Sequence, residues 1–217
     1  DFSVHWSQST IYVEPENENC DMDGAFEALK KVFGIVSLSR AMACEKDPDA
    51  IAKTAKTYLA DAMRSSASFK VETKRADKRF PMTSIELSQY VGRRLASAFP
   101  KIKVDVHNPE LVVNLEVRDR AAYVHSAPHP GAGGMPVGSN GRAVTLLSGG
   151  IDSPVSSYMI AKRGVHLIPI HFFSFPYTSQ QAKEKVIELA RILTDYCGRL
   201  TLEIVPFTRI QEEIGKN

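Results

Sequence analysis

Residues 148–153, Ser148-Gly149-Gly150-Ile151-Asp152-Ser153, decide how the C-terminal part of the chain folds. They follow a continuously apolar run at 143–147, which is typical of a buried strand in a parallel sheet. Helical spacing begins at Ser153, and the proline that follows it suits the first turn of a helix. The pattern therefore predicts a strand, a tight loop and a helix, with the loop at the carboxyl end of the strand.

The composition of this loop favours phosphate binding. Ligands of open α/β sheets bind at the carboxyl ends of strands, and the first amides of a helix attract anions. Gly149 and Gly150 lack Cβ atoms, so we expect them to let backbone amides approach an anion, and they permit positive φ angles. Ser148 and Ser153 supply hydroxyl groups, and a carboxylate at Asp152 suits a magnesium ligand beside phosphates. The loop is neither a Walker loop nor a GxGxxG motif.

The remainder of this segment continues the alternation of strands and helices. Apolar runs at 165–173 and 202–205 predict two further strands, while helical spacing predicts helices at 153–163, at 179–197 and from 208 onward. A βαβαβα order implies a doubly wound parallel sheet. Three strands make a small sheet of this kind, so we expect the domain to be incomplete.

The residues before the loop predict two α+β units. Residues 1–42 suit the order strand, strand, helix, strand. Residues 47–126 suit a helix with its N-cap at Asp47, a strand at 69–74, a second helix after a capping box at Thr83, and three strands. Residues 128–141 contain five glycines and three prolines, which predicts a linker.

Charge is distributed unevenly along the chain. The 27 basic and 25 acidic residues give a net charge of +2, but residues 1–69 carry −4 (7 − 11), residues 70–120 carry +4 (11 − 7) and residues 121–217 carry +2 (9 − 7). A basic middle segment is compatible with a nucleic-acid surface. No apolar run is long enough to span a bilayer. The three cysteines form no CxxC pair, which favours a reducing, cytoplasmic compartment.

Several motifs together resemble one family. The hexapeptide SGGIDS at 148–153 resembles the signature of PP-loop ATP pyrophosphatases. The stretches FKVETKRADKRFPMTSIELSQYVGRRL (69–95) and VDVHNPELVVNLEVRDRAAYVHS (104–126) look like a THUMP RNA-binding domain, and LKKVFGIVSLSRA (29–41) looks like the rear part of a ferredoxin-like domain. This order is similar to the tRNA 4-thiouridine synthase family, also called ThiI or tRNA sulfurtransferase. The resemblance predicts a partial ferredoxin-like domain at 1–45, a THUMP domain at 46–127, a linker at 128–141 and the first part of a PP-loop domain at 142–217.

The resemblance implies an activity. In that family ATP adenylates the uridine at tRNA position eight, at C4, and a persulfide sulfur delivered from a cysteine desulfurase then displaces AMP. A supply of sulfur for thiamine thiazole synthesis is also associated with the family. The resemblance implies ATP and Mg²⁺ as cofactors, tRNA and a cysteine desulfurase as partners, and a cytoplasmic location without a membrane, and it leaves a homodimer open. We expect this stretch to be an N-terminal fragment, inactive alone, because the sulfur-handling cysteine of the family would lie beyond Asn217.

Individual residues follow from the same resemblance. Asp152 is the candidate catalytic residue, and the nucleotide contacts are expected at Leu146, Leu147, Ser148, Gly149, Gly150, Asp152, Ser153, His171 and Phe172. The RNA contacts are expected among basic residues of the THUMP-like segment, namely Lys70, Lys74, Arg75, Lys78, Arg79, Arg93 and Arg94. Cys197 lies on an apolar helical stripe and is interpreted as structural. No site for a resident protein-bound metal is expected.

Two other functions remain open from the sequence. The chain fits a different THUMP and PP-loop enzyme that modifies tRNA, or an RNA-binding module with a vestigial nucleotide loop. The intact SGGIDS sequence argues against the second alternative.

Overall fold

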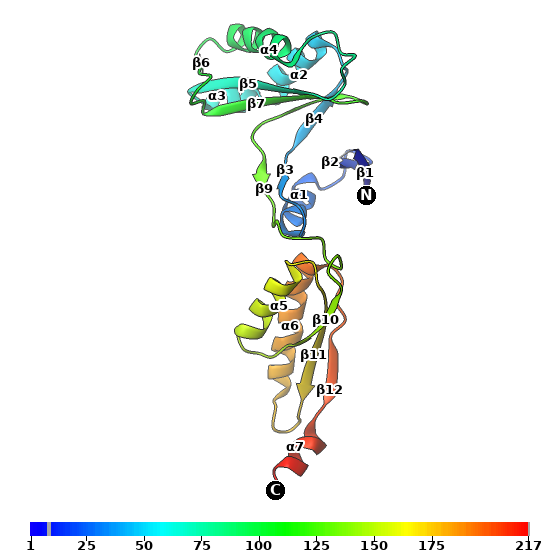
Figure 1. Cartoon of the computed structure of the whole chain (residues 1–217). Helices are drawn as coiled ribbons and strands as arrows, with labels where there is room; N and C mark the ends of the chain where they lie inside the picture. The colour runs from blue at the N-terminus through cyan, green and yellow to red at the C-terminus, as the bar shows by residue number, and fades with distance from the viewer. Residues whose placement is uncertain (8–9, 217) are drawn as a thin grey trace. The chain divides into compact units, whose positions relative to one another are not determined.

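The computed structural model describes residues 1–7 and 10–216 and divides the chain into two compact units. One unit comprises residues 39–129, and the other combines residues 1–38 with residues 130–217. Figure 1 shows the elements of both units and labels all of them except β8. None of the helices in the described ranges is long and apolar enough to cross a membrane.

The unit formed by residues 39–129 is a mixed sheet covered by helices. Its sheet has the order β4-β8-β7-β5-β6, in which β5 runs parallel to β6 and β7, and β8 runs antiparallel to β7 and β4. The strands are β4 (Ala41–Cys44), β5 (Ser68–Arg75), β6 (Lys103–Val104), β7 (Leu111–Val117) and β8 (Ala122–His125), and the helices are α2 (Pro48–Tyr58), α3 (Ala60–Ser65) and α4 (Ser84–Ala98).

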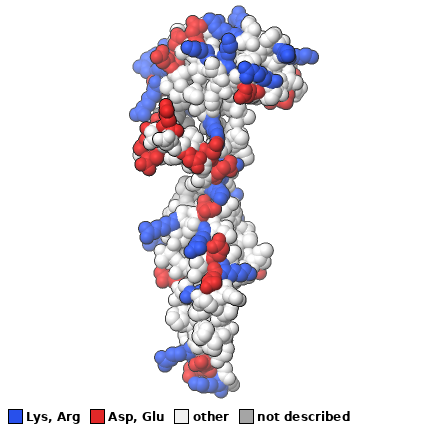
Figure 2. Space-filling view, turned by 180° about the vertical axis from the view of Figure 1, so that it is seen from behind, with Lys and Arg blue, Asp and Glu red and all other residues white. Residues whose placement is uncertain are grey.

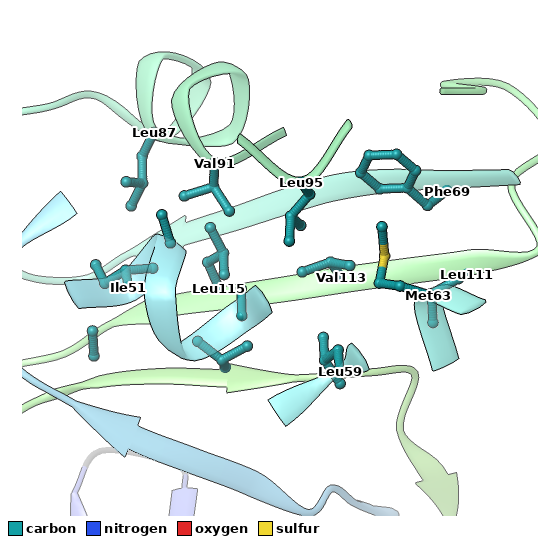
Figure 3. Close-up of a cluster of buried hydrophobic side chains, with 14 of the residues drawn as sticks. Ile51, Leu59, Met63, Phe69, Leu87, Val91, Leu95, Leu111, Val113 and Leu115 are labelled. Carbon is teal, nitrogen blue, oxygen red and sulfur yellow. The ribbon is translucent and has the colours of Figure 1, made fainter. Parts of the chain in front are cut away.

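Alternation of side chains places the core of this unit between sheet and helices. Every second residue of β7, from Leu111 to Val117, is buried, as expected for a strand with one covered face. The helices supply the other side of the core through residues such as Ile51 and Leu87, as Figure 3 shows. The predicted capping box starts α4: the Thr83 hydroxyl accepts from the amide of Glu86, whose carboxylate accepts from the amide of Thr83.

In the other unit, residues 142–216 form the predicted parallel α/β layer. Strands β10 (Arg142–Leu146), β11 (His166–Phe173) and β12 (Glu203–Pro206) are parallel and adjacent in that order. Helix α5 (Asp152–Ala161) joins the first two, α6 (Gln180–Cys197) joins the last two, and α7 (Thr208–Ile214) follows. The side chain of Leu147 packs with Val186 and Leu193 of α6, so this face of the sheet carries the core.

Residues 1–38 of this unit form a hairpin, a helix and a short strand. Strands β1 (Phe2–Ser7) and β2 (Thr10–Pro15) pair antiparallel, α1 (Met22–Lys31) follows, and β3 (Ser37–Leu38) pairs with β9 (His129–Pro130). Phe33, only 3% exposed, packs against the rings of Tyr158 and Tyr196, with centroids 5.0 and 5.9 Å away, and these two rings also contact each other. Lys31 Nζ lies 2.7 Å from Asp195 Oδ2. The N-terminal segment is therefore packed onto α5 and α6.

The glycine-rich segment 128–141 is held by hydrogen bonds on two sides. The amide of Gly133 donates to the carbonyl of Ile35 at 2.8 Å, and the amide of Met135 donates to the carbonyl of Lys162 at 2.9 Å. A Cβ atom on Gly131 would lie 2.3 Å from the carbonyl oxygen of Ile35. Glycine is therefore required here for close approach of two backbones.

Candidate functional site

The loop Ser148–Ser153 lies at the carboxyl end of β10 and opens α5, as predicted. The helix starts one residue earlier than expected, at Asp152. The two serines of the loop fasten it internally: the amide of Ser148 donates to Ser153 Oγ at 2.9 Å, and that hydroxyl lies 3.3 Å from the carbonyl of Ser148. Ser148 Oγ also accepts from the amide of Gly150, at 3.4 Å. The serines therefore shape the loop, a role that sequence reasoning had not assigned to them.

The N-terminus of α5 has no side-chain cap. Helices α1, α2, α4 and α6 are capped by Asp21, Asp47, Thr83 and Ser179. At α5, in contrast, no side chain of the described residues accepts a hydrogen bond from the first turn, and the N-cap position is Ile151. Uncapped amides and the positive end of the helix dipole favour an anion at this position. The side chain of Asp152 is exposed in the same first turn.

Gly149 and Gly150 do not use the positive φ angles that glycine permits. Their backbones lie outside the left-handed region. A Cβ atom on Gly149 would lie 3.6 Å from Lys185 Cδ, and one on Gly150 would lie 3.6 Å from Ser148 Oγ, both ordinary contacts. The fold therefore does not require glycine at either position, which leaves close approach of a ligand as its physical use.

The other expected nucleotide residues divide between the two faces of the sheet. Leu146 and Phe172 lie on the face opposite to α5 and α6 and are 63% and 45% exposed. Leu147 is 2% exposed and packs against α6, and His171 is buried on that side as well. Neighbouring strand residues point to opposite faces, so these four side chains cannot line one surface together, although their backbones lie at the same sheet edge.

His171 ties the ends of two strands together. Its Nδ1 atom lies 3.0 Å from the carbonyl oxygen of Leu147, so Nδ1–H donates to it. In the neutral ring, Nε2 is then an acceptor. Nε2 is buried and has no hydrogen-bond partner among the described residues. An unpaired buried acceptor costs free energy, and a ligand with an N–H group would satisfy it.

Cys197 is buried in the packed interior, as the sequence indicated. Burial raises the pKa of its thiol to about 11. A thiolate is the reactive form, so this residue is structural.

The seven basic residues expected to contact RNA all lie in the unit 39–129, but they differ in availability. Figure 2 shows lysine and arginine side chains over this unit, with acidic ones among them. Lys74, Lys78 and Arg93 are exposed. Lys74 also lines a groove of about 400 Å³ between β5 and the start of α4. Lys70 instead pairs with Glu72 at 2.6 Å.

The arginines are largely engaged within the protein. Arg75 Nη1 donates to the carbonyls of Phe80 and Met82 at 3.2 and 3.1 Å, so its guanidinium fastens the loop after β5. Arg94 Nη2 lies 2.6 Å from Asp49 Oδ1. Arg79 is paired with Asp77 and nevertheless exposed.

Comparison with known proteins gives a consistent family assignment. The ThiI ferredoxin-like domain family matches residues 1–39, the THUMP domain family matches residues 45–126, and the family described as thiamine biosynthesis protein (ThiI) matches residues 138–217. The chain belongs to the ThiI family. The resemblance drawn from SGGIDS and its surroundings is thereby confirmed, as is the fold class of an α+β region followed by a parallel α/β sheet.

ThiI relatives match almost the whole chain. The probable tRNA sulfurtransferase of Acetivibrio thermocellus is 50% identical over 212 residues, which is 97% of this chain and 54% of the relative. That of Moorella thermoacetica is 47% identical over 197 residues, 91% of this chain and 50% of the relative. A crystal structure of a 4-thiouridine synthetase–RNA complex with bound ATP is 34% identical, with a TM-score of 0.85, over 99% of this chain and 56% of that one. The chain thus spans about half the length of the relatives it matches.

Proposed function

We propose that this chain supplies the nucleotide loop and an RNA-binding unit of a tRNA sulfurtransferase that makes 4-thiouridine at position eight of tRNA. The observation that supports this most directly is the uncapped N-terminus of α5 behind the loop Ser148–Ser153, at the carboxyl edge of a parallel sheet. The bound ATP and RNA of the similar 4-thiouridine synthetase agree with it.

In this proposal the loop holds the phosphates of ATP. The amides of Gly149 and Gly150 and those of the first turn of α5 would donate to phosphate oxygens, and the nucleoside would contact the ends of β10 and β11, partly through the backbone of Leu146, Leu147, His171 and Phe172. The exposed carboxylate of Asp152 fits Mg²⁺, which prefers oxygen ligands and neutralises phosphate charge. His171 Nε2 would accept a hydrogen bond from the base.

The residues would orient ATP so that the C4 oxygen of the uridine attacks the α phosphorus and pyrophosphate leaves. The outer sulfur of a protein persulfide would then attack C4 as AMP departs, a second thiol would cleave the S–S bond to release the 4-thiouridine, and an external thiol reductant would reduce the disulfide left behind. The family resemblance alone supports four further proposals: cysteine desulfurase as the sulfur donor, a cytoplasmic location, a link to thiamine thiazole synthesis, and domain boundaries at 45, 127 and 141. The resemblance leaves open whether the protein forms a homodimer.

Three results on the full-length protein test the function. With tRNA and ATP, wild type is expected to release pyrophosphate and, with a sulfur donor, to form 4-thiouridine. Asp152→Ala should abolish pyrophosphate release while tRNA affinity stays within about two-fold. If wild type binds tRNA but releases no pyrophosphate, the chain is an RNA-binding module and the proposal is wrong. If other thiolated bases form instead, it is a different tRNA-modifying enzyme.

A further inference from the structure

An acidic residue lies beside two basic residues in the loop between β5 and α4. Between β5 and α4, residues 76–82 read Ala-Asp-Lys-Arg-Phe-Pro-Met, and Asp77 is the acidic member. Its side chain is only 6% exposed, although its neighbours Lys78 and Arg79 face solvent. A buried carboxylate is retained only where charged or hydrogen-bonding partners surround it.

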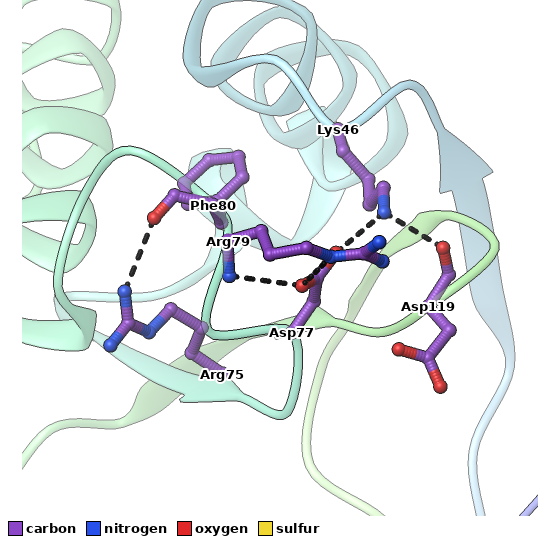
Figure 4. A network of polar contacts seen from close by, with 6 residues as sticks. All are labelled: Lys46, Arg75, Asp77, Arg79, Phe80 and Asp119. Atoms are coloured by element: carbon purple, nitrogen blue, oxygen red, sulfur yellow. Dashed lines mark hydrogen bonds and ion pairs between the residues drawn. The ribbon is translucent and has the colours of Figure 1, made fainter.

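Asp77 has such partners on both carboxylate oxygens, as Figure 4 shows. Oδ1 accepts from the backbone amide and from Nε of Arg79, each at 3.0 Å. Oδ2 accepts from Arg79 Nη2 at 3.2 Å and from Lys46 Nζ at 2.7 Å. The Arg79 and Lys46 charges hold the pKa of this carboxyl well below its usual range, so it remains charged in neutral solution.

The surrounding contacts fix the loop in place. The amides of Ala76 and Asp77 donate to the carbonyl of Val117 at 2.9 and 3.3 Å. Lys46 Nζ donates to the carbonyl of Asp119 at 2.7 Å, which links the loop to the turn between β7 and β8. Phe80 is buried in the core. The loop is therefore a rigid platform, and Lys46 and Asp77 form its centre.

Arg79 is held on this platform and still offers donors. Its side chain is 80% exposed, although Nε and Nη2 both contact Asp77. A guanidinium has five N–H donors in one plane. The two contacts with Asp77 use one on Nε and one on Nη2, so three remain for an acceptor. This geometry suits a phosphate oxygen, which arginine recognises better than lysine does.

We propose that Asp77 is a positioning residue for RNA binding: it orients Arg79 so that the outer edge of the guanidinium contacts a phosphate of the RNA backbone. The inference rests on the proposed RNA-binding function and names a residue for it. An arginine that is already ordered loses less side-chain freedom on binding. Immobilising one flexible side chain on binding costs about 0.5–1.5 kcal/mol, so an arginine that is already ordered should raise the affinity for RNA roughly two- to ten-fold.

The direction in which Asp77→Asn changes RNA affinity distinguishes positioning of Arg79 from a general electrostatic effect of the Asp77 charge. Asp77→Asn removes a negative charge, so long-range attraction alone would tighten RNA binding. Positioning predicts the reverse: Asp77→Asn should weaken binding about two- to ten-fold. Asp49→Asn is the matched control, because it removes a carboxylate that pairs with Arg94 of α4 in the same unit. It should leave affinity unchanged or slightly increase it.

The experiment is a double-mutant cycle on the full-length protein with a tRNA transcript at fixed salt. Wild type, Asp77→Asn, Arg79→Ala and the double variant are compared by Kd, and thermal unfolding is followed in parallel. The double variant should bind as weakly as Arg79→Ala, because Asp77 acts through Arg79. Wild-type affinity in Asp77→Asn, additive losses, or an Arg79→Ala variant that binds normally would each overturn the inference.

A further variant, Arg79→Lys, keeps the test decisive if Asp77→Asn unfolds. Arg79→Lys retains the charge but cannot form the paired contact with Asp77, so it should bind tRNA almost as weakly as Arg79→Ala. If Arg79→Lys binds like wild type, orientation does not matter and the inference is wrong. Failure of wild type to bind tRNA at all would instead overturn the proposed function.

Discussion

Gly149 and Gly150 should tolerate alanine in the fold but not in the function. A Cβ atom added at either position would lie 3.6 Å from its nearest neighbour, and neither backbone is in the left-handed region. Alanine at such a position usually stabilises a protein by about 0.4–1 kcal/mol, because the unfolded chain loses freedom. We therefore expect Gly149→Ala and Gly150→Ala to unfold at the same temperature as wild type or slightly higher.

Binding of ATP should respond in the opposite direction. A methyl group on either residue would occupy space that a phosphate oxygen needs when it contacts the adjacent amides. The loss of one hydrogen bond to a charged group costs about 1.5–3 kcal/mol, which corresponds to a roughly ten- to hundred-fold higher Kd. Stability and affinity should thus separate at these two positions.

Calorimetric titration with ATP and thermal unfolding of the full-length variants measure the two effects. Gly131→Ala is the control, since its Cβ would lie 2.3 Å from the carbonyl oxygen of Ile35. It should lower stability by about 1–3 kcal/mol with little direct effect on the loop. If Gly149→Ala and Gly150→Ala bind ATP with wild-type affinity, the assignment of the loop to phosphate binding is refuted.

Four further substitutions test the packing of Phe33, the ionisation of Glu116 and the roles of two basic residues of β5. Phe33→Ala should lower the free energy of unfolding by about 3–5 kcal/mol, as for other buried aromatic residues. Denaturant titration measures this loss, and a value below about 1 kcal/mol would contradict the packing of Phe33 described above. Hydrogen bonding to His125, and also to Arg118, lowers the pKa of Glu116 to about 2. Because the pKa of Glu116 is lower in the folded protein than the unfolded value of 4.5, its ionised carboxylate stabilises the fold above that pH. This stabilisation should be lost as the pH falls from about 4.5 to 2. Glu116→Gln should remove that part of the acid-unfolding slope; an unchanged slope would exclude Glu116 as its source. Lys74→Ala should lower the salt slope of tRNA binding by about one and leave the melting temperature unchanged, whereas Arg75→Ala should lower the melting temperature. If Arg75→Ala instead changes only the salt slope and Lys74→Ala only the melting temperature, Arg75 is the RNA contact and Lys74 the structural residue.

Most of the helices and strands could be predicted because the patterns that mark them involve residues close together in the chain. The capping box at Thr83, the alternation from Leu111 to Val117 and the loop Ser148–Ser153 each depend on neighbours within a few residues. Strand β4, which the sequence analysis did not identify, depends instead on pairing with β8, about 80 residues away in the chain. Its four residues are exposed or half-buried, so no hydrophobic period marks them.

The candidate nucleotide site shows where a motif is insufficient. The motif located the loop, but it could not show whether its glycines use the positive φ angles that they permit. In the structure they do not, whereas Gly133 and Gly134 in the preceding segment are left-handed. The two serines fasten the loop through hydrogen bonds that depend on its exact path. Burial of His171, with an Nε2 atom that has no hydrogen-bond partner among the described residues, could not be predicted either, because burial depends on tertiary packing and not on neighbours in the sequence.

The basic segment shows a similar limit for charge. The net charge of +4 in residues 70–120 counts every arginine equally, whether or not its side chain is available to contact RNA. In the structure Arg75 binds two carbonyls and Arg94 binds Asp49, so both charges mainly stabilise the unit. Asp77 lowers the net charge of the loop, but it places Arg79 in a defined orientation. Because phosphate recognition depends on geometry as well as charge, an acidic residue can strengthen a basic surface, and a count of charges along the sequence cannot show this.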